Sequence, residues 1–148
     1  MIDTPGYGDT YGVLRIFANG FYHYRLYSKV KNIKFILCFD YSNIQGTGQP
    51  FIETIREFTA SFKDYLDNPE EIWKSCCFLF NKTPDSETIK DDIKTKLTSI
   101  VSTVKSQMNE RELDVFKKFV SYIVEQDRIF NVKRYKNGET TNETGMLR

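Results

Sequence analysis

Three short stretches of the chain are apolar without interruption, and longer stretches between them repeat apolar positions every three or four residues. The short stretches are Ile33–Phe39, Ser75–Phe80 and Ile129–Val132. A continuous apolar run of this length is typical of a strand buried on both faces, as in a parallel sheet covered by helices. The pattern therefore predicts an α/β fold in three layers, with a mostly parallel sheet flanked by helices.

Four longer stretches have the spacing of an amphipathic helix. One begins at Pro50, which a first helical turn tolerates, and ends before Asn68. Another follows Asn109 and Glu112, which are spaced almost as in a capping box. A weaker stretch is interrupted at Asn19-Gly20 and predicts an irregular helix. The four apolar stripes are Leu14, Phe17, Phe21 and Tyr24; Phe51, Ile55, Phe58, Phe62 and Leu66; Ile89, Ile93, Leu97, Ile100, Val104 and Met108; and Leu113, Phe116, Val120 and Ile123.

The order of these stretches predicts where the strands end. Strands and helices alternate, and right-handed crossovers between parallel strands bring all the carboxyl ends to one edge of the sheet. The residues expected there are Asp3, Asp40, Asn81 and approximately Asn131. Ligands of open α/β sheets bind at this edge, so its polar residues form the candidate site.

The first candidate is an acidic, glycine-containing stretch at the start of the sequence, Asp3-Thr4-Pro5-Gly6-Tyr7-Gly8. A carboxylate at a strand end can hold Mg²⁺ through water. A glycine three residues later lets a backbone N–H approach a terminal phosphate, and the second glycine supplies a mobile loop. The alternative is an ordinary turn, for which Pro-Gly is suitable by itself.

The second candidate is Asn81-Lys82, which directly follows the apolar run ending at Phe80. In a nucleotide site, such an amide fixes the loop and the lysine stem covers the face of a purine. The alternative is that these residues end the strand and cap the next helix. One strand–helix unit separates the pair from Asp3, and this spacing favours a nucleotide site.

Three segments together carry a resemblance to a known family. DTPGYGDT, FILCFD and FLFNK resemble the core of P-loop GTPases of the translation-factor-related class, and the first segment is similar to septins and to AIG-type immunity-associated GTPases. The resemblance covers about Ile2 to Val132. It implies a partial G domain over residues 1–133, followed by a flexible polar tail over residues 134–148.

The resemblance also implies ligands and roles, with GTP and Mg²⁺ bound together. Asp3 would hold Mg²⁺ through water, and Gly6 would donate its N–H to the γ-phosphate. Asn81 and Lys82 would belong to the guanine-recognition box, and Asn131 would occupy the last base-contacting loop. The remaining segment residues would form the phosphate-facing turn and the switch II loop, namely Thr4, Pro5, Tyr7 and Gly8.

The sequence departs from the family in the guanine box. The family pattern is Asn-Lys-x-Asp, and here Pro84 takes the place of the aspartate, with Asp85 one position later. Either the loop shifts so that Asp85 contacts guanine, or discrimination against adenine is weakened and an ATP-binding protein results. The segment from Asp40 to Pro50 also lacks the septin pattern, so the chain is not expected to be a septin.

The phosphate-binding motif Gly-x-x-x-x-Gly-Lys-Ser/Thr occurs nowhere in the 148 residues. The resemblance therefore implies the back portion of a GTPase domain, N-terminally truncated before its P-loop. Without the phosphate-binding loop, we expect such a chain to bind GTP poorly and to hydrolyse none. An exposed strand edge invites association, so we also expect the chain to be marginally stable or to aggregate. The rival hypothesis is a non-enzymatic interaction module that assembles into homo- or hetero-oligomers.

Composition adds mainly exclusions. The chain has a net charge of +1 and 40% hydrophobic residues, which indicates one globular domain with no charge to attract nucleic acid or an anionic membrane. A signal-peptide pattern is absent, and His23 as the single histidine makes a zinc site improbable. Cys38, Cys76 and Cys77 lie in apolar runs and are expected to be buried, reduced thiols of a cytoplasmic protein.

Overall fold

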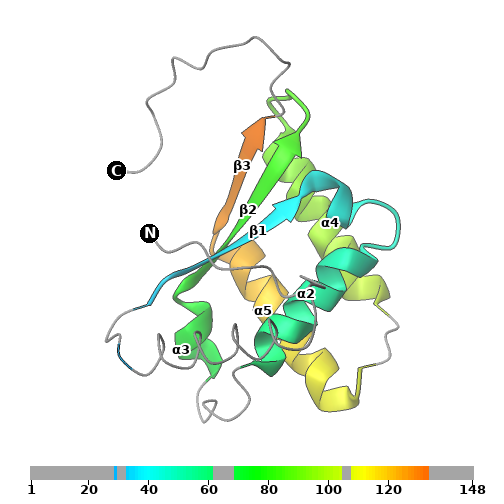
Figure 1. The fold of residues 1–148 in the computed structure, drawn as a ribbon. Helices are drawn as coiled ribbons and strands as arrows, with labels where there is room; N and C mark the ends of the chain where they lie inside the picture. The colour runs from blue at the N-terminus through cyan, green and yellow to red at the C-terminus, as the bar shows by residue number, and fades with distance from the viewer. Residues whose placement is uncertain (1–28, 30–32, 62–68, 105–107, 134–148) are drawn as a thin grey trace, which may run out of the picture.

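The computed structural model describes residue 29 and residues 33–61, 69–104 and 108–133. Within these ranges the chain alternates strands with helices and forms an α/β domain (Figure 1). The elements in chain order are β1 (Phe35–Asp40), the 3₁₀ helix η1 (Tyr41–Ile44), α2 (Gln49–Ala60), α3 (Pro69–Trp73), β2 (Cys76–Thr83), α4 (Ile89–Thr103), α5 (Glu110–Glu125) and β3 (Ile129–Lys133).

The described strands form one parallel sheet in the order β1-β2-β3. In its register Asp40 lies opposite Asn81, and Phe80 lies opposite Asn131. The carboxyl ends of the strands therefore share one edge, called here the carboxyl edge, which confirms the predicted α/β class and parallel sheet.

The helices that connect the strands pack on one face of the sheet. Phe78 of β2 makes edge-on ring contacts with both Phe51 of α2 and Phe119 of α5, at centroid distances of 5.6 Å each. Phe51 and Phe119 are completely buried, and α4 packs beside α5. Two crossovers of the same hand, in a sheet whose strand order follows chain order, place their helices on the same side.

Local signals in the sequence set the helix starts. Asn109 Oδ1 accepts a hydrogen bond from the Glu112 N–H at 2.9 Å, and Glu112 Oε2 accepts one from the Asn109 N–H at 3.2 Å. The predicted capping box is thus confirmed. Helix α2 begins after Gly48, whose φ is +67°. A Cβ there would lie 2.4 Å from Ile100 Cδ1, so glycine is required for conformation and space alike.

Several element ends differ from the prediction. Helix α4 ends at Thr103, because Val104 leaves helical geometry with ψ of 111°, although Val104 and Met108 still pack against the core. The short elements η1 and α3 were not anticipated by any stripe. Their lengths of four and five residues are too small for a helical period to emerge from the sequence.

The second face of the sheet is not covered by the described helices, which corrects the expectation of strands buried on both faces. Phe39 and Ile129 are 3% and 1% exposed, whereas Ile36 and Phe130 are 46% and 56% exposed. Cys38 is exposed too, so the expectation of three buried thiols is wrong for this residue. We call this surface the open face; its residues are Ile36, Cys38, Cys77, Leu79 and Phe130.

Candidate functional site

The carboxyl edge brings together the polar residues that end the strands. Asn81 of β2 is the register partner of Asp40 at the end of β1, and Asn131 of β3 pairs with the residue that precedes Asn81. Lys82 and Asp85 follow on the same segment of chain. The structure therefore assembles at one edge all the predicted nucleotide-site residues that lie within the described ranges.

Strand β2 extends further than the sequence suggested, and this changes the setting of Asn81 and Lys82. The strand continues through Thr83, so the prediction that Asn81-Lys82 follows the strand is wrong. Phe80 pairs with Asn131 and Thr83 pairs with Lys133, which leaves one extra residue in β2. Such a bulge changes the direction of a side chain at the end of a strand.

The bulge turns Lys82 toward β1. Its φ is +53°, and its Nζ lies 2.7 Å from Asp40 Oδ2, with side chains 62% and 34% exposed respectively. Thr83 fixes the far end of the bulge, because its buried Oγ1 donates a hydrogen bond to the Val132 carbonyl at 3.0 Å. An ion pair this exposed contributes at most about 1 kcal/mol, so a ligand can displace it.

Asp85 lies one residue after the aspartate position of the guanine box, and it forms an ion pair with Lys133. Its Oδ1 lies 2.8 Å from Lys133 Nζ, and the Asp85 side chain is 79% exposed. The ion pair joins the loop after β2 to the end of β3. As with Lys82, the pair is solvent-exposed and therefore exchangeable.

Asn81 contributes the one unsatisfied group of this edge among the described residues. Its Oδ1 is buried and has no hydrogen-bond partner. A buried acceptor without a donor costs about 1–3 kcal/mol. Sequence reasoning chose Asn81 by its position after an apolar run, but the unpaired oxygen depends on the bulge and could not be predicted.

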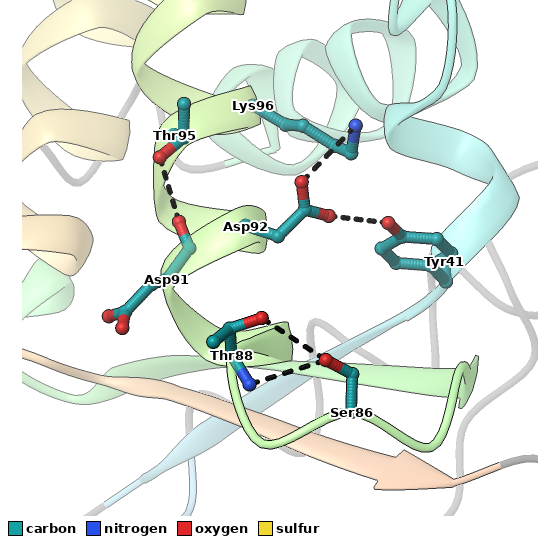
Figure 2. Close-up of polar contacts among 7 residues, drawn as sticks. All are labelled: Tyr41, Ser86, Thr88, Asp91, Asp92, Thr95 and Lys96. Carbon is teal, nitrogen blue, oxygen red and sulfur yellow. Dashed lines mark hydrogen bonds and ion pairs between the residues drawn. The ribbon is translucent and has the colours of Figure 1, made fainter.

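A second polar cluster lies at the start of α4 (Figure 2). The Tyr41 hydroxyl donates a hydrogen bond to Asp92 Oδ2 at 2.5 Å, and Lys96 Nζ lies 3.5 Å from the other oxygen of Asp92. Burial raises the pKa of Tyr41, and its hydrogen bond to Asp92 raises that pKa further. The cluster ties η1, directly after Asp40, to the first turn of α4.

The loop that carries Asp85 is closed by two hydroxyl groups in the same view. Ser86 Oγ and Thr88 Oγ1 lie 3.1 Å apart, and the Thr88 N–H donates to Ser86 Oγ at 3.3 Å (Figure 2). These contacts stabilise the turn just after Asp85. No pattern in the sequence indicates a role for Ser86, Thr88 or Tyr41, and only their place beside the predicted loop could have drawn attention to them.

The other predicted site residues lie outside the described ranges. These are Asp3, Thr4, Pro5, Gly6, Tyr7 and Gly8, together with the tail over residues 134–148. The predicted Mg²⁺ ligand is therefore not placed. Within the described ranges no group of three His, Cys, Asp or Glu side chains could hold a metal ion.

The thiols of Cys76 and Cys77 are not activated. Burial raises the pKa of Cys76 to about 12, and burial also raises the pKa of Cys77. Both remain protonated at neutral pH, so neither is a ready nucleophile.

The described part of the chain also contains no helix with the length and apolarity to cross a membrane.

The fold and the carboxyl edge define the class of this domain: a parallel α/β sheet flanked by helices, with polar residues gathered where its strands end. The chain matches no protein-family model, no curated protein and no solved structure. Conclusions about its activity therefore depend on the chemistry of the carboxyl edge.

Proposed function

We propose that the carboxyl edge binds a guanine nucleotide by its base, as the base-recognition part of a GTP-dependent switch domain. The observation that carries the proposal is the buried, unpaired Oδ1 of Asn81. It lies at the sheet edge where ligands of open α/β folds bind, beside a lysine and near an exposed carboxylate.

The chemistry of guanine suits these residues. Its Watson–Crick edge offers an N1–H and an exocyclic NH₂ group as donors, and the exposed carboxylate of Asp85 can accept from both. Asn81 supplies an acceptor and two amide donors to the other polar atoms of the base. Lys82 can leave Asp40 and lay its methylene stem along the ring, because the ion pair is exposed.

Pro84 stands where the guanine box has its aspartate, and in this proposal Asp85 takes over the role of that aspartate. The hydrogen bonds of Ser86 and Thr88 fix the turn immediately after Asp85. Among the residues that the structure describes, Lys133 alone is paired with the Asp85 carboxylate. We propose that Asp85 exchanges Lys133 for the guanine edge. Adenine lacks the two adjacent donors, so discrimination against ATP depends on this carboxylate.

The phosphates and Mg²⁺ belong, in this proposal, to the segment Asp3–Gly6, with Tyr7 and Gly8 in the following switch loop. The sequence holds no Gly-x-x-x-x-Gly-Lys-Ser/Thr motif, and phosphoryl transfer depends on such groups for position and charge. Binding by the 148-residue chain is therefore expected to be weak and base-centred, with no measurable hydrolysis.

Competition titrations with a fluorescent GDP analogue test the proposal on the full chain. GTP, GDP and guanosine should compete better than ATP and adenosine. Asp85→Asn should remove that preference. Asn81→Leu should weaken guanosine binding by about tenfold, because one neutral hydrogen bond is lost and a donor of the base is left unpaired. The matched control Asp114→Asn changes a carboxylate that pairs within α5 and should have no effect. Equal competition by adenosine and guanosine, unchanged in both site variants, would refute guanine recognition.

A further inference from the structure

Two of the three cysteines lie on the open face, on neighbouring strands. Cys38 belongs to β1 and Cys77 to β2, and these two strands are paired in parallel (Figure 1). In their register Ile36 is the partner of Cys77, and Cys38 lies two residues further along β1. Residues two apart on a strand point to the same face, so both thiols project from the same side of the sheet.

A disulfide between Cys38 and Cys77 does not fit this register. Neighbouring strands lie about 4.8 Å apart and two residues advance a strand by about 6.6 Å, which puts the two Cα atoms about 8 Å apart. A disulfide needs a Cα separation below about 7 Å. The pair therefore cannot be oxidised to a disulfide without movement of the backbone.

The two thiols are nevertheless close enough to act on each other. Cys38 Sγ lies 3.9 Å from the carbonyl oxygen of Ile36, the residue that is level with Cys77. Burial raises the pKa of Cys77, and negative charge on Cys38 raises it further. A cation held between the two sulfur atoms would remove this repulsion.

We propose that Cys38 and Cys77 form a two-coordinate site for a soft monovalent metal ion, namely Cu⁺. Thiolates are the ligands that select this ion. A metal–sulfur bond is about 2.3 Å long, so a bridging ion spans about 4.6 Å between two sulfurs, against about 2 Å in a disulfide. This longer reach suits side chains whose Cα atoms are about 8 Å apart.

The surroundings favour two ligands and a single negative charge. Among the described residues no group of three His, Cys, Asp or Glu side chains could hold a metal ion, so they do not supply the four ligands of a zinc site. Binding of Cu⁺ releases both thiol protons and leaves a bridge with one net negative charge. The positive charge of Arg128, which lowers the pKa of Cys77, also favours that bridge. The inference is independent of the proposed nucleotide site.

Anaerobic titration of the full chain with Cu⁺, in competition with the chelator bicinchoninate, tests the site. Native mass spectrometry should show one Cu⁺ per monomer. Cys38→Ser and Cys77→Ser should each weaken binding by more than about a hundredfold, which exceeds the loss caused by changing an outer-shell partner. The matched control Cys76→Ser removes a thiol that donates to the Ile72 carbonyl on the other face, and it should keep the wild-type affinity.

A labelling measurement on the wild-type chain keeps the test decisive if a serine variant unfolds. One equivalent of Cu⁺ should protect Cys38 and Cys77 together from N-ethylmaleimide, with the sites located by mass spectrometry. Unchanged affinity in Cys38→Ser, or protection of one of the two cysteines without the other, would overturn the proposal. So would one Cu⁺ held between two chains, with a dimer in light scattering, because the exposed Cys38 thiols of two copies would then be the ligands.

Discussion

Lys82, on the bulge near the end of β2, places its ammonium group 2.7 Å from the Asp40 carboxylate at the end of β1. The two residues are 42 positions apart in the sequence, and the bulge makes their contact possible. The ion pair occupies the lysine that the proposed nucleotide site needs. Its strength therefore opposes ligand binding.

Removing the partner of Lys82 should strengthen nucleotide binding. Asp40→Asn leaves Lys82 available, so the affinity for guanosine and GDP should rise by up to about fivefold, equivalent to at most about 1 kcal/mol. The effect should shrink in high salt, because the wild-type ion pair is then already screened. Titration of Asp114→Asn provides the comparison; a fall in affinity for Asp40→Asn would mean that Asp40 itself contacts the ligand.

Gly48 and Gly46 allow a matched test of the α2 start. Both have positive φ, of +67° and +58°, but only Gly48 faces a side chain, Ile100. Gly46→Ala should cost about 1 kcal/mol of unfolding free energy, and Gly48→Ala should cost about 2–3 kcal/mol, since overpacking adds to the backbone strain. Urea denaturation measures both values, and equal losses would show that Ile100 gives way freely.

The acid dependence of stability should depend on Asp127. Hydrogen bonds and charge from Lys90 and Lys94 lower the pKa of Asp127 to about 2 in the folded chain. A depressed folded-state pKa contributes stability that is present above the unfolded value, about 3.9, and is lost as the pH falls toward 2. In Asp127→Asn the free energy of unfolding should fall less steeply between about pH 4 and pH 2 than in the wild-type chain.

Asparagine is the suitable replacement at this position, because Asp127 has a φ of +54° and asparagine tolerates left-handed backbone. In the Asp127→Asn background, changing Lys90 and Lys94 to methionine should leave the slope between these pH values unaltered. Parallel pH curves for the wild-type chain and Asp127→Asn would show that the two ion pairs do not persist in solution.

The single tryptophan reports on the packing of α3 against α5. Trp73 is 6% exposed and stacks on Phe119 at a centroid distance of 5.8 Å, so its emission should be blue-shifted in the folded chain. Phe119→Leu should shift that emission to the red and cost about 1–2 kcal/mol. Phe130→Leu, on the opposite face, should leave the Trp73 spectrum unchanged; a shift there would indicate rearrangement of the whole sheet.

The apolar runs and helical stripes were enough to predict a parallel sheet, the order of its elements along the chain and the capping box of Asn109 and Glu112. These features depend on local chemistry and on patterns that repeat within a few residues. The burial of one face only was missed, because Ile36 and Cys38 are as apolar as their buried neighbours. The sequence pattern alone could not show that a face made of such residues is exposed.

The candidate site was predictable in position and not in detail. Strand ends identified Asn81 and Asn131, but the bulge at Lys82 has no glycine or other local signal. The ion pair of Asp85 with Lys133 joins residues 48 positions apart by sequence number, a distance over which no short-range rule applies. The unpaired oxygen of Asn81 likewise has no signal in the sequence.

The central claim is that Asn81 and Asp85 recognise a guanine base at the carboxyl edge. The most direct measurement is an NMR titration of the isotopically labelled chain with guanosine and, separately, adenosine, following backbone amides and the Asn81 side-chain NH₂. The account predicts that guanosine shifts the signals of Asn81, Lys82 and Asp85 in a saturable manner and that adenosine does so far more weakly. Identical shifts with both nucleosides, or shifts confined to other parts of the domain, would contradict it.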